Sequence, residues 1–152
     1  MTQQLVSSLG LYGAIVLIAF IAGMFPLVSI EVFLIGASIV RHPSVGELAL
    51  WVVLAAIGHQ VAKTLCFFGG ELALDRPSLR PRLDRARAKI ERWAKRPIVF
   101  MVLGATIGLP PMYLLAFIAE PLLGIRFVPF TLICFVGRVG RYAVMAGAAL
   151  LF

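Results

Sequence analysis

The chain has 152 residues, of which 61% are hydrophobic and only 14% are charged. An ordinary soluble domain is about 45–50% apolar and about 25% charged, and a soluble fold of this length could not bury so much apolar surface. The composition therefore excludes a water-soluble enzyme or DNA-binding domain and predicts one integral membrane domain over residues 1–152. At about 20 residues per crossing, this domain has room for at most about seven spans.

The net charge of +7 is concentrated in one window of the chain, residues 75–96. This window holds nine of the fourteen basic residues and three acidic ones, so it carries +6 of that net charge. A basic cluster can bind nucleic acid, but a basic loop between two hydrophobic blocks is typical of the cytoplasmic side of a membrane protein. We therefore expect no nucleic-acid partner, and we expect the loop to contact anionic lipid headgroups in the cytoplasm.

The hydrophobic residues form six segments, which cover residues 9–24, 27–40, 46–73, 97–108, 111–124 and 127–152. The first two are about 15 residues each, too short to span a bilayer unless strongly tilted. They meet at Pro26, and the fourth and fifth segments meet in the same way at Pro110 and Pro111, where a helix cannot continue. Two interpretations follow. Each pair is either a set of kinked or closely spaced transmembrane helices, or a re-entrant hairpin whose tip lies inside the membrane and is sheltered by protein.

A weak internal repeat favours the re-entrant hairpins. The stretch AIGHQVAK (56–63) resembles FVGRVGRY (135–142) in its placing of glycine and basic residues. Gly58 follows Pro26 by 32 residues, and Gly137 follows Pro110 by 27. Broken segments at corresponding positions of two halves point to the substrate site of a transporter.

The repeat predicts the organisation and the fold class. Repeat 1 covers about residues 9–74, the basic linker covers 75–96, and repeat 2 covers about 97–152. If the first hairpin enters and leaves on the outer face, the segment that follows it crosses inward. The second hairpin then enters and leaves on the inner face, and the last segment crosses back out. The expected fold is all-α, with two oppositely oriented re-entrant hairpins and transmembrane helices in an inverted repeat.

Residues 81–97 form a separate element in this prediction. Pro81 suits the first turn of a helix and Pro97 its end. Apolar residues fall on one face of this segment and Arg and Lys on the other. We expect an amphipathic cytoplasmic helix on the headgroups, with Trp93 at the interface.

Ionisable side chains within apolar segments are the strongest functional signal, because a charge in the bilayer core costs a few kcal/mol at least. Five such residues are expected near one depth and are the candidate substrate-binding or ion-binding residues: Glu31, His59, Lys63, Arg138 and Arg141. His59 and Lys63 are spaced i, i+4, and the two arginines i, i+3, so each pair shares a helix face.

These five residues allow more than one role. Glu31 is either a titrating carboxylate or half of an ion pair with Lys63 or an arginine, and the two roles can coexist. His59 is either a hydrogen-bonded packing residue or a proton relay. Arg138 and Arg141 are candidates to hold a phosphate, because the guanidinium fork matches phosphate oxygens.

The hairpin tips and three glycines complete the predicted site. The half-helices that begin after Pro26 and at Pro111 would present unpaired backbone N–H groups to a phosphate headgroup. Gly58, Gly137 and Gly140 would let a helix pack closely against a hairpin. The two cysteines lack the spacing of a metal site, and the sequence contains no hydrolase or metalloprotease motif. We therefore expect no metal, no cofactor and no catalytic residues.

Three stretches carry a resemblance to a known family. They are FIAGMFPLVSIEVFLIGASI in the first hairpin, AAIGHQVAKTLCFFGG after it, and the C-terminal half. In that half, a WxxR motif (Trp93 to Arg96) precedes a proline-containing hairpin and the segment GRVGRY (137–142). These features resemble the DedA superfamily, whose core is the VTT or SNARE-associated Golgi protein domain, and most closely its short YqaA-type branch.

The resemblance implies two oppositely oriented re-entrant hairpins and a role in moving lipids across or between leaflets. Such lipids include undecaprenyl phosphate in bacteria and phospholipids in eukaryotic relatives, and some bacterial members resemble proton-coupled transporters. Glu31 matches the acidic residue that follows F-x-P in the family's first hairpin. The better-studied branch also has an acidic residue near the position of Gln60 and arginines in the second hairpin, whereas residues 105–115 contain none here.

Three hypotheses follow. The first is a bacterial inner-membrane lipid flippase or scramblase, multi-pass, that handles a phosphate-bearing headgroup such as a polyprenyl phosphate or a phospholipid. The second is a proton-coupled transporter of a small solute, and the third is a membrane scaffold that transports nothing. One chain offers little interior to shelter two hairpins, so a homodimer is one of the states to test.

Overall fold

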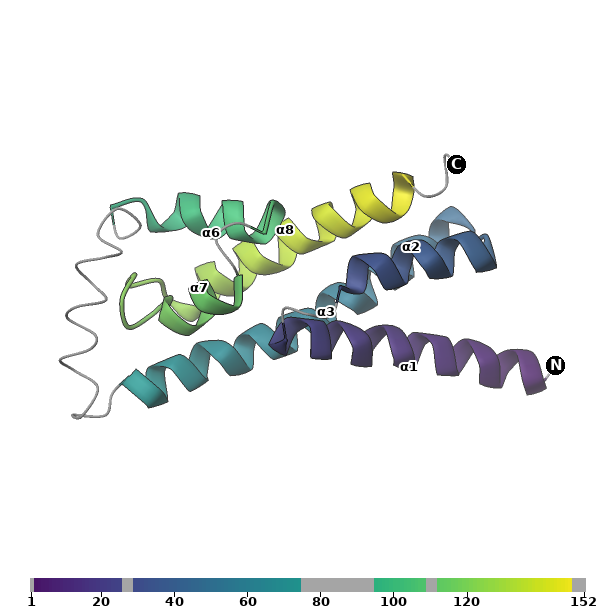
Figure 1. Cartoon of the computed structure of the whole chain (residues 1–152), viewed down its shortest axis with the longest axis horizontal. Coiled ribbons are helices and arrows are strands. Elements are labelled where there is room, and N and C mark those ends of the chain that lie inside the picture. Colours follow the sequence, from purple (N-terminus) through teal and green to yellow (C-terminus); the bar gives the residue numbers. More distant parts are fainter. Residues whose placement is uncertain (1, 26–28, 75–94, 109–111, 149–152) are drawn as a thin grey trace. The chain divides into compact units, whose positions relative to one another are not determined.

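The fold is built from helices alone in the part of the chain that the computed structural model describes, residues 2–25, 29–74, 95–108 and 112–148. In chain order the helices are α1 (Thr2–Met24), α2 (Ile30–Arg41), α3 (Val45–Leu74), α6 (Pro97–Thr106), α7 (Met112–Ile118) and α8 (Phe127–Ala148) (Figure 1). The expectation of an all-α chain is confirmed for these residues. The amphipathic helix expected at 81–97 falls almost entirely outside them.

The first predicted break separates α1 from α2, which pack against each other as a helical pair (Figure 1). Ser29 caps the start of α2, because its Oγ accepts a hydrogen bond from the backbone N–H of Val32 at 3.4 Å. At the other end, His42 adopts a left-handed conformation with φ of 44° and donates its N–H to the carbonyl of Ser38. α2 therefore has a defined start and stop on either side of its apolar residues.

The second predicted break separates α6 from α7, which also pack as a pair. Gly108 follows α6 with φ of 89°, a left-handed conformation that glycine adopts without steric cost. Helix α7 covers only the first part of the apolar segment 111–124, since it ends at Ile118 and turns follow to residue 123. Pro121 explains the early end, because it has no N–H to donate and disfavours helix at the residue before it.

Length and hydropathy together distinguish α3 and α8 from the short helices α2 and α6. α3 and α8 each contain a stretch long and apolar enough to cross a membrane, Val45–Gly70 and Phe127–Ala148. In contrast, α2 with 12 residues and α6 with 10 are only about 18 and 15 Å long at 1.5 Å per residue. A bilayer core is about 30 Å thick, so neither short helix can cross it alone.

The chain divides into two compact units that cut both long helices. Unit 1 contains residues Met1–Ala62 and Arg138–Phe152, and unit 2 contains Lys63–Gly137. Each unit therefore combines one helix pair with part of α3 and part of α8. Unit 1 has the first part of α3 and the last part of α8, and unit 2 has the remaining parts.

Within unit 1, α1 and α3 approach each other at glycine. A Cβ on Gly58 would overlap the carbonyl oxygen of Val16 on α1, so only glycine allows this contact. Gly23 on α1 meets α3 in a similar way, since a Cβ there would lie 2.5 Å from the Cβ of Ala62. These contacts place the backbone of α3 directly against α1.

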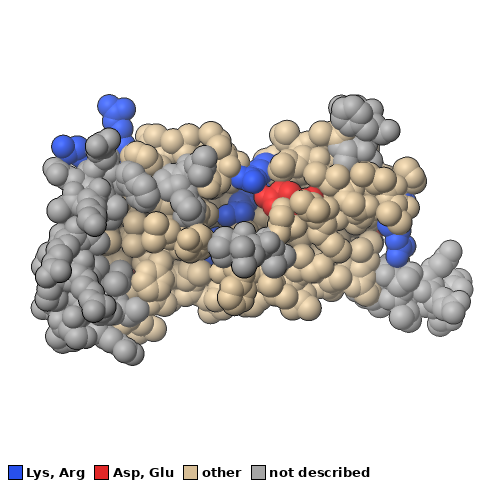
Figure 2. All heavy atoms as spheres, viewed as in Figure 1, with Lys and Arg blue, Asp and Glu red and all other residues tan. Residues whose placement is uncertain are grey.

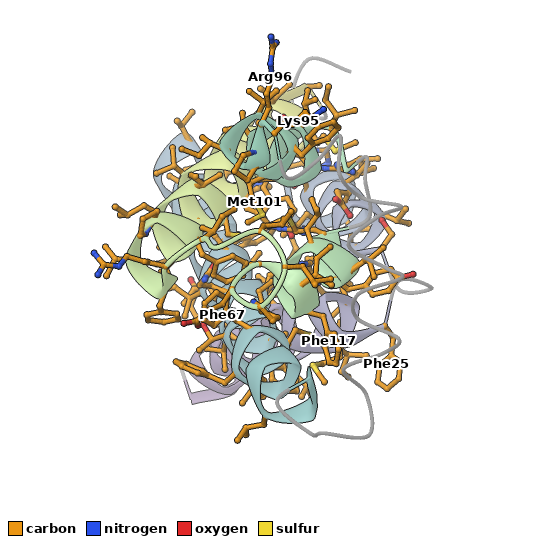
Figure 3. The ribbon with its side chains drawn as sticks, turned by 90° about the vertical axis from the view of Figure 1, so that its left-hand side faces the viewer. Phe25, Phe67, Lys95, Arg96, Met101 and Phe117 are labelled. Carbon is orange, nitrogen blue, oxygen red and sulfur yellow. The ribbon has the colours of Figure 1, made fainter. Side chains whose placement is uncertain are left out.

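Unit 2 has its own apolar core, formed by α6, α7 and the adjoining parts of α3 and α8. Figure 3 shows Met101 of α6 inside this core, while Lys95 and Arg96 extend away from it. The rings of Phe67 and Phe130 stack with centroids 4.8 Å apart. The core is thus built from side chains that are distant in sequence.

Glycine also brings helices together in unit 2. A Cβ on Gly137 of α8 would lie 2.7 Å from the Cβ of Ala105 on α6, and one on Gly70 would overlap the carbonyl oxygen of Phe117. Gly140 differs from these, because no described atom outside its own helix backbone and chain neighbours lies within 4 Å of where its Cβ would stand. The close packing expected at Gly140 is therefore not found among the described residues.

Candidate functional site

Three polar side chains meet inside unit 1, between α3 and α8. The hydroxyl of Tyr142 lies 3.0 Å from Nδ1 of His59, and Arg138 Nη1 lies 3.3 Å from the same hydroxyl and 3.5 Å from the same ring nitrogen. All three residues are buried, with exposed fractions of 4% for His59, 8% for Arg138 and 0% for Tyr142. The three groups form a closed triangle of polar contacts within apolar surroundings.

The direction of these hydrogen bonds follows from the chemistry of arginine. A guanidinium has N–H donors and no acceptor, so Arg138 donates both to the Tyr142 oxygen and to His59 Nδ1. The Tyr142 hydroxyl lies nearer to the same Nδ1, at 3.0 Å, so the single lone pair of that nitrogen is shared between this hydroxyl and Arg138 Nη1. Nδ1 of His59 is therefore an acceptor, which makes the imidazole neutral with its proton on Nε2.

Arg138 is left with a positive charge that its contacts do not neutralise. Within the described parts of the chain, its hydrogen bonds to Tyr142 and His59 go to neutral groups, and its Nε, which is buried, has no hydrogen-bond partner. A buried charge is normally paired, because transfer of an unpaired ion out of water is costly. This guanidinium therefore has both the charge and a free donor to bind an anion.

A second contact in unit 1 joins α2 to α8. Arg141 Nε lies 3.0 Å from Glu31 Oε1, and both side chains are mostly buried. The other carboxylate oxygen of Glu31 accepts a hydrogen bond of 2.9 Å from the Ser29 hydroxyl. Figure 2 shows acidic and basic atoms together on a face that is otherwise made largely of uncharged residues. Of the two roles left open for Glu31, the structure shows the ion pair.

Helix geometry explains why the two contacts are neighbours. Arg138, Arg141 and Tyr142 are spaced i, i+3 and i+4 on α8, so they share one face of the helix. Both Glu31 and Arg141 act electrostatically on the Tyr142 hydroxyl. These residues form one group, which we call the unit 1 polar cluster; its members are Glu31, His59, Arg138, Arg141 and Tyr142.

Lys63 is the one predicted ionisable residue outside this cluster. It follows His59 by one turn of α3 and is buried, with an exposed fraction of 3%, but it belongs to unit 2. The structure therefore brings four of the five predicted residues together in unit 1. The role predicted for Lys63 stays a prediction.

The predicted hairpin tips lie at the edge of what the structure describes. Pro26, Pro110 and Pro111 fall outside the described residues. The start of α2 is described, and there the Ser29 side chain already occupies one of the N–H groups that a phosphate would need. Glu31 also stands in the first turn, where its negative charge interacts favourably with the helix dipole.

Two residues of the site were not among the predicted ones. Tyr142 is one of them, because its hydroxyl joins Arg138 to His59; its i+4 spacing from Arg138 could have indicated this contact. Ser29 was not considered, although a serine just before a helix with an acid two residues later is a capping signal. No group of three His, Cys, Asp or Glu side chains able to hold a metal ion exists among the described residues.

Comparison with known proteins adds no family to this description. No family model matches the chain, and no curated protein or solved structure was found to match it.

The ion pair between Glu31 and Arg141 leads to a stability prediction. Either Glu31→Gln or Arg141→Gln alone is expected to destabilise the protein by about 1–3 kcal/mol, because each leaves a largely buried charge without its partner. The double variant Glu31→Gln/Arg141→Gln should be closer to the wild type than the sum of the two changes. Thermal unfolding of the purified protein in detergent measures all three. Additive losses would show that the pair does not interact energetically.

Proposed function

We propose that this chain is a DedA-like membrane protein that moves lipids with a phosphate-bearing headgroup between bilayer leaflets. In this proposal it is a multi-pass protein of the bacterial inner membrane, with the basic window 75–96 in the cytoplasm. The unit 1 polar cluster recognises the phosphate. Arg138 is the residue that holds it, and Glu31 with Arg141 sets the charge beside it.

The surface of the long helices supports a membrane location. A helix as apolar as α3 or α8 would be mostly buried in a soluble protein, but only 44% of the apolar window of α3 and 22% of that of α8 are buried. Large apolar side chains are exposed along one face of α3 at i, i+4 spacing: Val53, Ile57, Val61 and Leu65. Such continuous apolar surface suits contact with lipid tails and would promote aggregation in water.

The proposed function rests on one observation, which is that the buried guanidinium of Arg138 contacts no carboxylate among the described residues. Arg138 as a residue is 8% exposed, and its guanidinium contacts neutral groups and has a buried N–H without a hydrogen-bond partner among the described residues. A structural arginine in apolar surroundings would be expected to pair with a carboxylate, as Arg141 does. Arginine recognises phosphate oxygens through the planar fork of its N–H donors. An anionic headgroup would supply the missing partner.

The composition of the two units supports an inverted repeat. Exchanging the two halves of the chain exchanges α1, α2 and α3 with α6, α7 and α8. Unit 1 contains the first part of α3 and the last part of α8, and unit 2 contains the last part of α3 and the first part of α8. The same exchange therefore converts unit 1 into unit 2. The contact of Gly58 in α3 with α1 and the contact of Gly137 in α8 with α6 are equivalent in this comparison. In these pairs α2, α6 and α7 are too short to span a bilayer, which suits re-entrant hairpins, whereas α1 has 23 residues.

The topology leads to a labelling prediction. In a variant with Cys66 and Cys134 changed to alanine, single cysteines at Ser44 and Lys95 should react with a membrane-impermeant reagent from opposite sides. Lys95→Cys should react from the cytoplasmic side, because it belongs to the basic window, and α3 lies between the two positions. Both positions are exposed, so access does not limit labelling. Reaction of both from the same side would show that α3 does not cross.

Reconstitution of the purified protein into lipid vesicles tests the function itself. A phospholipid with a fluorescent acyl chain is placed in both leaflets, and an impermeant quencher is added outside. Vesicles without protein should lose about half of the fluorescence, the outer-leaflet share, whereas active protein should raise the loss well beyond this value by moving inner lipids outward. A loss equal to that of protein-free vesicles would contradict lipid movement and favour a scaffold. Quenching that requires a pH gradient would instead favour proton-coupled transport.

A further inference from the structure

We infer that the unit 1 polar cluster selects a phosphate with a single negative charge, which is a phosphodiester headgroup, over a phosphomonoester. The inference rests on the proposed function and specifies the substrate class of the same site. It follows from the charges that the cluster contains and from where they are located.

The described members of the cluster carry one positive charge in excess. Arg138 and Arg141 each contribute a positive charge, and Glu31 contributes the carboxylate that pairs with Arg141. The hydrogen bonds require His59 to be neutral and Tyr142 to keep its proton. The excess charge is therefore located on Arg138.

A phosphodiester and a phosphomonoester differ in the charge they bring to this site. A diester has one acidic oxygen and carries one negative charge, whereas a monoester carries about −1.5 to −2 at pH 7. The single excess positive charge of Arg138 neutralises a diester completely. With a monoester, a negative charge of about 0.5 to 1 remains without a partner. Because the surroundings of Arg138 are apolar, an uncompensated charge there is costly, so the diester is the better fit.

The test compares two lipids with identical fluorescent acyl chains in the vesicle assay, phosphatidylglycerol as the diester and phosphatidic acid as the monoester. We expect phosphatidylglycerol to move about tenfold faster, the ratio that corresponds to about 1.4 kcal/mol of differential interaction. Equal rates, or faster movement of phosphatidic acid, would overturn the charge assignment but leave lipid movement intact. If neither lipid moves, the proposed function fails, and the inference fails with it.

Variants that change the charge of the cluster make the test specific. Glu31→Gln raises the excess to two positive charges and should shift the ratio of rates toward phosphatidic acid. Glu31→Gln/Arg141→Gln restores a single excess charge on Arg138 and should restore the wild-type ratio. Lys63→Gln should leave the ratio of the phosphatidylglycerol rate to the phosphatidic acid rate unchanged. A higher ratio in this variant would show that Lys63 is a second cation at the site, and it would overturn the assignment of a single excess charge. The same assignment would be overturned if Glu31→Gln left the ratio of the two lipid rates unchanged.

A binding measurement covers the case in which Glu31→Gln fails to fold. The thermal stability of the wild-type protein in detergent is measured with phosphatidylglycerol, with phosphatidic acid and with dimethyl phosphate, a water-soluble diester. At equal concentration, a ligand that binds only the folded state raises the unfolding temperature more the tighter it binds. We expect a larger shift with phosphatidylglycerol than with phosphatidic acid. A smaller shift for dimethyl phosphate than for phosphatidylglycerol identifies the lipid as the source of the phosphodiester, and a larger shift with phosphatidic acid overturns the inference.

Discussion

Replacing Arg138 by glutamine is expected to reduce lipid movement to the rate of protein-free vesicles. Among the described members of the unit 1 polar cluster, the guanidinium is the charge without a carboxylate partner, so an anionic headgroup would lose the cation that the cluster offers it. Loss of one partner from a buried, hydrogen-bonded charge pair costs about 2–5 kcal/mol, which corresponds to a rate loss of about 30-fold or more. The quenching assay in vesicles measures this loss directly.

The stability of the same variant separates a functional role from a structural one. In the absence of substrate, Arg138 contacts two neutral groups, and the hydrogen bond between Tyr142 and His59 does not need it. Removing an uncompensated buried charge should therefore leave the unfolding temperature unchanged or raise it. An arginine that served only to hold α3 against α8 would show the opposite pattern, with a lower unfolding temperature and normal transport in whatever protein remains folded.

Two further variants control for general effects of charge. Arg126→Gln removes an exposed arginine just before α8 and should leave lipid movement unchanged, since that residue lies outside the cluster. Arg138→Lys keeps the charge but replaces the planar fork with a point charge, so it should restore movement only partly. Wild-type movement in Arg138→Gln would refute the phosphate site.

The course of the chain could be predicted from sequence because its signals are local. Pro26 and the pair Pro110–Pro111 interrupt apolar runs, and the described helices on either side end or begin close to these prolines. A proline prevents the normal hydrogen bond of a helix whatever the tertiary structure is. The same rule accounts for the length of α7, because Pro121 lies inside the apolar segment 111–124 and the helix ends before it.

The pairing of the charges could not be predicted, because it depends on tertiary contacts. The sequence identified Glu31 as a partner for Lys63 or an arginine, but nothing local indicates that Arg141 rather than Arg138 would pair with it. That choice determines which arginine keeps an unopposed charge. The two arginines are three residues apart on one helix face, so the rotation of α8 relative to α2 decides it.

The glycines show the same division between local and tertiary information. Gly58, Gly137 and Gly140 have similar surroundings in sequence, and all three were expected to allow close packing. The structure distinguishes them, because Gly58 and Gly137 meet a neighbouring helix, whereas Gly140 meets none of the residues that the structure describes. Which glycine faces a neighbour depends on helix rotation, and this difference has a measurable consequence.

Gly58→Ala is expected to destabilise the protein by about 1–3 kcal/mol, and Gly58→Leu to prevent folding. A Cβ at this position would overlap the carbonyl oxygen of Val16, and helix backbone cannot move aside as a flexible side chain can. Gly140→Ala, on α8, is the matched control, because a Cβ at this position would meet no described atom. Alanine favours a helix over glycine by about 0.5–1 kcal/mol, so the stability of this variant should stay the same or rise. Thermal unfolding in detergent compares the two variants. Equal tolerance of alanine at both positions would show that α1 and α3 do not make this contact, whereas loss of stability only at Gly58 would establish it without any assay of transport.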